Sequence, residues 1–157
     1  MSNSLTVTAP DGLPFVDFER EFDAPVAALF AAHADPQKVA AWFGPRGYDV
    51  EVGEWDFTTG GRWHMTHIDG AQRYEFRGTF HTVRENDFAI QTFEFLGAPD
   101  IVSIETVRFV DLGEGRSKLV GHATYPSLEA RDGMVESGME RGMAEGYERL
   151  DEALAAA

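Results

Sequence analysis

Cysteine is absent from the 157-residue sequence, and its absence excludes disulfides, thiolate metal sites and cysteine nucleophiles together. Lysine is scarce, with only Lys38 and Lys118. No apolar run is long enough to span a bilayer, and residues 1–12 lack the apolar core of a signal peptide. From these absences we expect a cytoplasmic protein without a membrane partner.

Positive charge is also in short supply. Lysine and arginine number 13 against 27 aspartate and glutamate residues, which gives a formal net charge of -14. Such a charge repels nucleic-acid phosphates and anionic membrane surfaces, so neither is expected as a partner. The hydrophobic content of 43% is enough for one domain to bury a core without cross-links.

The pattern at the N-terminal end predicts a flexible leader over residues 1–12 and a single domain over residues 13–157. Within residues 15–22, Val16, Phe18 and Phe22 share one parity while acidic residues occupy the other, which predicts a half-buried strand. Two short helices should follow. They begin at Asp23-Ala24-Pro25 and Asp35-Pro36, and Gly44-Pro45 should end the second one.

The rest of the chain predicts an antiparallel meander followed by one long helix. Short turn signals separate the expected strands, and such connections are typical of antiparallel neighbours. Strands followed by a separate helix indicate the α+β class, with one sheet face packed on that helix. The expected strands cover residues 48–57, 61–68, 72–84, 87–95, 101–111 and 116–125, and the helix covers residues 128–156.

The last helix has glycines in its apolar stripe, at Gly142 and Gly146, beside Met139 and Met143 and with Tyr147 at the edge. A glycine inside a helix costs about 0.5–1 kcal/mol relative to alanine, so its presence needs compensation. One interpretation is a close approach of the helix to the sheet. The other is that the missing side chains leave room for a guest molecule, which adaptable methionines would also suit.

Aromatic residues are dense on the expected strands. They either fill a bulky core or line a concave pocket, and Tyr74 and Tyr147 are the candidates for orienting a ligand because a buried hydroxyl needs a polar partner. The predicted ligand-binding set joins these residues to the helix stripe: Trp42, Trp55, Trp63, Met65, Tyr74, Phe76, Phe80, Phe93, Phe95, Met139, Gly142, Met143, Gly146 and Tyr147.

Motifs for catalysis or for a cofactor are missing. His64 and His67 are three residues apart on one strand and should point to opposite faces, which argues against a metal site. There is no nucleophile elbow and no phosphate loop, so neither a metal nor a cofactor is expected. Glu94 and Glu105 each lie within a strand near apolar residues. Each is either a solvated surface carboxylate or a buried acid with a raised pKa.

Several motifs together resemble the Aha-type family, homologues of the C-terminal domain of the activator of the heat-shock-protein-90 ATPase, within the START-like (SRPBCC) superfamily. The resemblance covers about residues 15–154 and implies a helix-grip fold, in which a curved seven-stranded antiparallel sheet surrounds a long C-terminal helix and encloses a cavity. The matching segments are Phe22-Asp23-Ala24-Pro25, Trp42-Phe43-Gly44-Pro45, Asp56-Phe57-Thr58-Thr59-Gly60-Gly61-Arg62-Trp63, Gly78-Thr79-Phe80 and Gly138-Met139-Glu140-Arg141-Gly142-Met143.

Three functions fit these observations. The first is binding of a hydrophobic or aromatic small molecule between sheet and helix. The second is an enzyme of cyclase, aromatase or hydrolase type, which needs a cavity-facing acid or base such as Glu94, His67 or Tyr74. The third is a protein that interacts with a chaperone. A chaperone partner is doubtful, because the sequence has no counterpart of the N-terminal domain that accompanies the eukaryotic activators. Formation of a homodimer is compatible with each.

Overall fold

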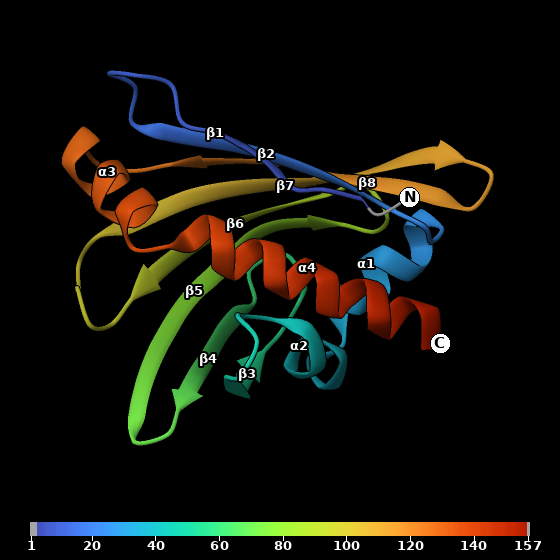
Figure 1. Ribbon diagram of the computed structural model, residues 1–157, viewed down its shortest axis with the longest axis horizontal. Helices are drawn as coiled ribbons and strands as arrows, with labels where there is room; N and C mark the ends of the chain where they lie inside the picture. The colour runs from blue at the N-terminus through green and yellow to red at the C-terminus, as the bar shows by residue number, and fades with distance from the viewer. Residues whose placement is uncertain (1–2, 157) are drawn as a thin grey trace.

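A single antiparallel sheet curves around a helix that crosses its concave face (Figure 1). The computed structural model describes residues 3–156. The strand order is β1-β2-β8-β7-β6-β5-β4-β3. The strands are β1 (Thr6–Thr8), β2 (Phe15–Phe22), β3 (Asp49–Trp55), β4 (Arg62–Asp69), β5 (Gln72–Arg84), β6 (Phe88–Phe95), β7 (Val102–Gly113) and β8 (Arg116–Thr124), and the helices are α1 (Val26–Ala34), α2 (Pro36–Trp42), α3 (Leu128–Glu136) and α4 (Met139–Ala156).

The predicted α+β helix-grip fold is confirmed, with eight strands in place of seven. The additional strand is β1, which lies inside the segment predicted as a flexible leader and pairs antiparallel with β2 from Thr6 opposite Glu19 to Thr8 opposite Asp17. Val7 is partly buried and packs against the core, which anchors this short strand. The prediction of a flexible leader over residues 1–12 is therefore wrong where β1 forms. Residues 1–2 of that segment lie outside the described residues.

The alternation that predicts β2 is confirmed by its burial. Val16, Phe18 and Phe22 are buried on the concave face, and so is Arg20, which is only 3% exposed. Both short helices also form. The Asp35 side chain accepts a hydrogen bond of 2.9 Å from the backbone N–H of Gln37 and so caps α2.

The long C-terminal helix was predicted as continuous but is broken into α3 and α4. Ser137 ends α3, and Gly138 follows with φ of 89°, a conformation that a residue with a Cβ rarely adopts. The apolar stripe continues across the break, and therefore the sequence pattern did not reveal it. Because of the break, α3 contacts β2 while α4 turns across the sheet (Figure 1).

Substitution of Gly138 tests this break. We expect Gly138→Ala to lower the free energy of unfolding by about 1–2 kcal/mol, because alanine is strained at positive φ. Gly133→Ala is the matched control within α3, where an added Cβ meets nothing within 4 Å. It should raise stability by about 0.5–1 kcal/mol through helix propensity. Urea unfolding measures both, and a stabilising Gly138→Ala would contradict the assigned conformation.

Two of the three hydrophobic clusters among the described residues join the helices to the concave face of the sheet. One joins α1, α2 and α4 to the sheet through Leu29, Trp42 and Leu150. The other places Val39 of α2 against Trp63 of β4. Among the described residues, no helix is long and apolar enough to cross a membrane.

Candidate functional site

A cavity of about 460 Å³ lies between the concave face of the sheet and the C-terminal helices. Its walls come from β2 to β7, from Tyr125 directly after β8, from both short helices, from residues 43–48 after α2, and from α3 and α4. Pockets for small ligands usually span about 300–1,000 Å³, so this space has the size of a binding site.

Most of the residues predicted to bind a ligand line this cavity. Phe80 and Phe95 do not. Phe80 is fully buried behind the lining, where its ring packs edge-on against Trp55 and Phe57, and Phe95 packs against Phe76 outside it. The predicted residues that line the cavity are Trp42, Trp55, Trp63, Met65, Tyr74, Phe76, Phe93, Met139, Gly142, Met143, Gly146 and Tyr147.

The three tryptophans form fixed parts of the wall. Each indole N–H donates to a backbone carbonyl: Trp42 to Ala32 at 3.0 Å, Trp55 to His33 at 2.9 Å, and Trp63 to Thr92 at 3.2 Å. With their polar atoms satisfied, the rings offer apolar surface to the cavity.

The two glycines of α4 differ, and the close approach that one of them permits is to a loop and not, as expected, to the sheet. At Gly146, an added Cβ would lie 3.3 Å from the carbonyl oxygen of Gly44, so this glycine permits a close approach of helix and loop. At Gly142, the nearest atom to an added Cβ is Pro45 Cδ at 3.9 Å, so this position borders open space. Of these two glycines, only Gly142 therefore leaves open space next to the helix.

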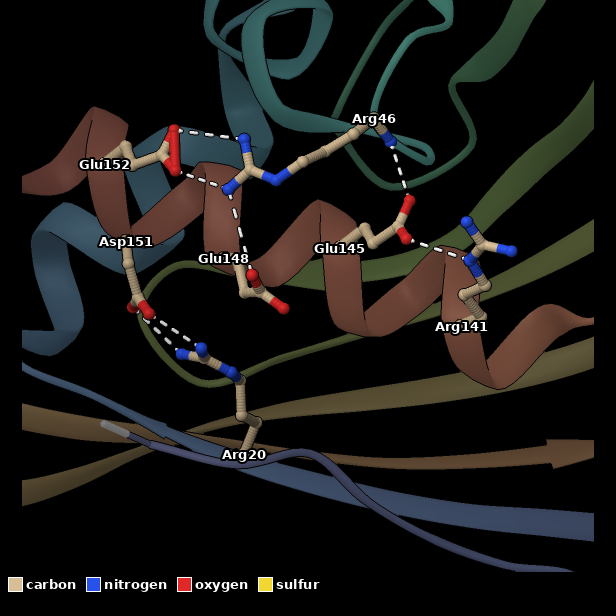
Figure 2. Close-up of polar contacts among 7 residues, drawn as sticks. All are labelled: Arg20, Arg46, Arg141, Glu145, Glu148, Asp151 and Glu152. Carbon is tan, nitrogen blue, oxygen red and sulfur yellow. Dashed lines mark hydrogen bonds and ion pairs between the residues drawn. The ribbon is translucent and has the colours of Figure 1, made fainter. Parts of the chain in front are cut away.

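Residues 43–48, which we call the cover loop, form a part of the site that the sequence did not indicate. Phe43, Gly44, Pro45 and Tyr48 line the cavity, although Gly44-Pro45 was interpreted only as the end of a helix. The loop is fastened to α4 by Arg46 (Figure 2). Its backbone N–H donates to Glu145 at 3.0 Å, and its guanidinium group forms ion pairs with Glu148 and Glu152.

The α3–α4 junction adds further lining that was not predicted. Met134, Ser137 and Gly138 border the cavity because the chain turns there instead of continuing as a helix. Ser137 and Gly138 are also exposed to solvent, so the cavity approaches the surface at this junction. The other wall residues lie outside the predicted ligand-binding set, although His67 and Glu105 were considered as acid or base candidates: Phe18, His33, Phe57, His67, Gln91, Ser103, Glu105, Val107 and Tyr125.

Of the two strand carboxylates, only Glu105 lines the cavity. It stands on β7 opposite Gln91 of β6, whose side-chain amide donates to it at 3.4 Å. Burial raises the pKa of Glu105 to about 7, and the hydrogen bond from Gln91 offsets only part of this effect. The interpretation of Glu105 as a solvated surface carboxylate was therefore wrong.

Glu94 does not line the cavity, so it does not meet the requirement for a cavity acid or base. It accepts a hydrogen bond of 2.8 Å from the backbone N–H of Asp100 and forms an ion pair of 2.9 Å with Arg77. Both contacts lower the pKa of its carboxyl group.

The histidines of the lining are neutral near pH 7. Burial lowers the pKa of His33 to about 4, and its Nδ1–H donates to the carbonyl of Leu29 at 2.8 Å. Burial, together with the charge of Arg149, lowers the pKa of His67 to about 4. Within residues 3–156, no three His, Asp or Glu side chains lie close enough together to hold a metal ion.

Comparison with known proteins agrees with this architecture. A protein from Arthrobacter aurescens shares 26% identity and superimposes with a TM-score of 0.87, covering 97% of this chain and 92% of that one. A protein from Rhodobacter sphaeroides shares the fold, with 24% identity and a TM-score of 0.86, covering 97% of this chain and 98% of that one. The AHSA1 protein from Silicibacter pomeroyi also shares the fold, with 24% identity and a TM-score of 0.72, covering 90% of this chain and 98% of that one.

No functionally curated protein matches the sequence. The family model described as "Activator of Hsp90 ATPase homolog 1-like protein" matches residues 23–155, nearly the whole domain. The chain therefore belongs to the Activator of Hsp90 ATPase homolog 1-like family, the family that its motifs resemble.

Proposed function

We propose that the protein binds one hydrophobic or aromatic small molecule in the cavity between the sheet and α4. The observation that carries the proposal is the cavity itself: about 460 Å³, walled mainly by aromatic rings and methionines. Rigid rings supply apolar contact area at a small entropic cost, and methionine adapts to irregular shapes. A chain without cysteine suits a reducing compartment, and we propose that it acts in the cytoplasm.

Tryptophan emission reports directly on occupancy, because all three tryptophans of the chain line the cavity. N-phenyl-1-naphthylamine, an uncharged aromatic probe, should quench this emission in a saturable titration with one site per chain. Absence of saturable quenching with this probe and with a panel of apolar compounds of similar size would overturn the proposed function.

Filling the cavity should abolish binding. We expect Gly142→Leu to weaken probe binding at least tenfold, because the new side chain occupies the open space beside Pro45. Gly133→Leu introduces the same side chain at a helical glycine outside the cavity lining and should leave the affinity unchanged. Equal affinities for the two variants would show that the probe binds elsewhere. Circular dichroism and urea unfolding check that both variants fold.

An acid–base enzyme is the second candidate, and Glu105 is the observation that favours it. A carboxyl group whose pKa lies near 7 can both donate and accept a proton at physiological pH. His67 and Tyr74 also line the cavity, but the pKa of His67 is too low for it to act as an acid there. Turnover of a bound compound that disappears in Glu105→Gln, with binding retained, would identify this activity.

A further inference from the structure

Glu105 lies in apolar surroundings on the floor of the cavity. Its partners across the sheet are Gln91 on β6 and Ala123 on β8, and its own strand places Ser103 and Val107 on the same face. Among the described residues, its carboxyl group forms no ion pair, and Gln91 is its one hydrogen-bond donor. Glu105 is partly buried, and a carboxylate withdrawn from water without a positive partner is unfavourable, so this position has a cost that packing alone does not explain.

The unused hydrogen-bonding capacity near Glu105 faces the cavity. Gln91 contacts Oε2, and Oε1 has no partner among residues 3–156. Tyr147, from α4, has no hydrogen bond to its hydroxyl within these residues, and the hydroxyl of Tyr125 has only a contact of 4.0 Å to the sulfur of Met139. Because no buried side-chain polar atom of the described residues lacks a partner, Oε1 of Glu105 and the hydroxyl of Tyr147 are accessible to solvent. The cavity thus contains an acceptor and two hydroxyl groups that can bind a guest.

The charge of the lining is one-sided. Within the part of the chain that the structure describes, the lining contains no lysine or arginine, and its two histidines are neutral near pH 7 because burial lowers their pKa values. Tyr125 and Tyr147 stay protonated, because burial and the nearby Glu105 raise their pKa values. An anionic ligand would find no cationic partner here, whereas a cationic ligand would meet Glu105 and aromatic faces that attract positive charge.

We propose that the cavity selects apolar molecules that carry a protonated nitrogen, such as an arylalkylamine cation or a basic nitrogen heterocycle, and that Glu105 is the group that binds this nitrogen. The inference rests on the proposed binding function and names its ligand class. Gln91 orients the carboxylate, the two tyrosine hydroxyls complete the polar end of the site, and the tryptophan and phenylalanine rings enclose the apolar part.

Three naphthalene derivatives of the same shape test the selection: 1-naphthylmethylamine, 1-naphthylmethanol and 1-naphthoate. Their affinities at pH 8 come from displacement of N-phenyl-1-naphthylamine. We expect the amine to bind about tenfold or more tightly than the alcohol, as a hydrogen bond to a charged group implies, and the carboxylate to bind most weakly. The preference should fall as the pH is lowered through about 7, because Glu105 then becomes protonated.

Glu105→Gln keeps the shape of the side chain and removes its charge. It should abolish the preference for the amine and leave the affinity for the alcohol within about twofold. Glu94→Gln is the matched control on the neighbouring strand, outside the cavity lining, and should keep the wild-type preference.

Three results would overturn the inference. If the alcohol binds but the amine binds no better, or if Glu105→Gln retains the preference, Glu105 does not select the ligand while the binding function stands. If neither the naphthalenes nor N-phenyl-1-naphthylamine binds, the proposed function and the inference both fail.

Discussion

Asp151→Ala should lower the free energy of unfolding by about 3 kcal/mol, one of the two largest effects that we expect from a single substitution. Asp151 of α4 accepts two hydrogen bonds, of 2.9 and 2.7 Å, from the guanidinium group of Arg20 (Figure 2). Arg20 is only 3% exposed on the concave face of β2. Removal of the aspartate leaves a buried cation without its partner. The Asp151 side chain is 37% exposed, so water that enters its place can solvate the guanidinium group and reduce part of the loss in stability.

Glu152→Ala is the matched control, because it removes the adjacent carboxylate of the same helix. Glu152 pairs with Arg46, and both side chains are exposed, so the loss should be much smaller than for Asp151→Ala. Urea unfolding compares the two variants. Equal losses would show that the Arg20–Asp151 pair has no special role in docking α4. The double variant Arg20→Met/Asp151→Leu should recover stability, because it removes both charges together.

Glu105→Gln should stabilise the protein relative to the wild type by an amount that grows with pH to about 3 kcal/mol. The pKa of Glu105 is raised from 4.5 to about 7 in the folded state. Between these values the folded protein holds a proton that the unfolded chain releases, so this group lowers stability as pH rises from about 4.5 to 7. Above pH 7 the loss is complete, and below pH 4.5 it is absent.

The measurement is the difference in unfolding free energy between Glu105→Gln and the wild type from pH 4 to pH 8. The difference is the informative quantity, because carboxylates with lowered pKa values, such as Glu94 and Glu145, change stability in the opposite direction. Glu94→Gln serves again as the control and should lose stability at pH 8. A difference for Glu105→Gln that does not vary with pH would show that its carboxyl group is well solvated.

Much of the fold followed from local pattern. The alternation in residues 15–22 identified β2 with its bounds and its buried face, and the capping signals at residues 35–36 located α2. β1 was missed because three residues are too few for a periodic signal, and its stability comes from pairing with β2. The break at Gly138 was missed because the apolar stripe of α3 and α4 has the same phase on both sides.

The site was predictable where it consists of apolar residues on regular elements. Trp63, Met65 and Phe76 followed from strand parity, and Gly142 from the helix stripe. The cover loop and Glu105 required the tertiary structure. A loop has no periodicity, and which face of a central strand meets the cavity depends on its neighbours on both sides, here Gln91 and Ala123. Phe80 has the parity of the lining but lies behind the rings of Trp55 and Phe57.

The sheet is open, and its two outer strands have a consequence for self-association. β1 offers only three residues for pairing with another chain. β3, at the opposite end, is interrupted by an irregularity between Val52 and Trp55 and carries Glu51 and Glu54. Short, bulged and charged outer strands are poor templates for strand addition, so they protect the protein from edge-to-edge aggregation. A second copy of the chain would have to associate through side chains on another surface.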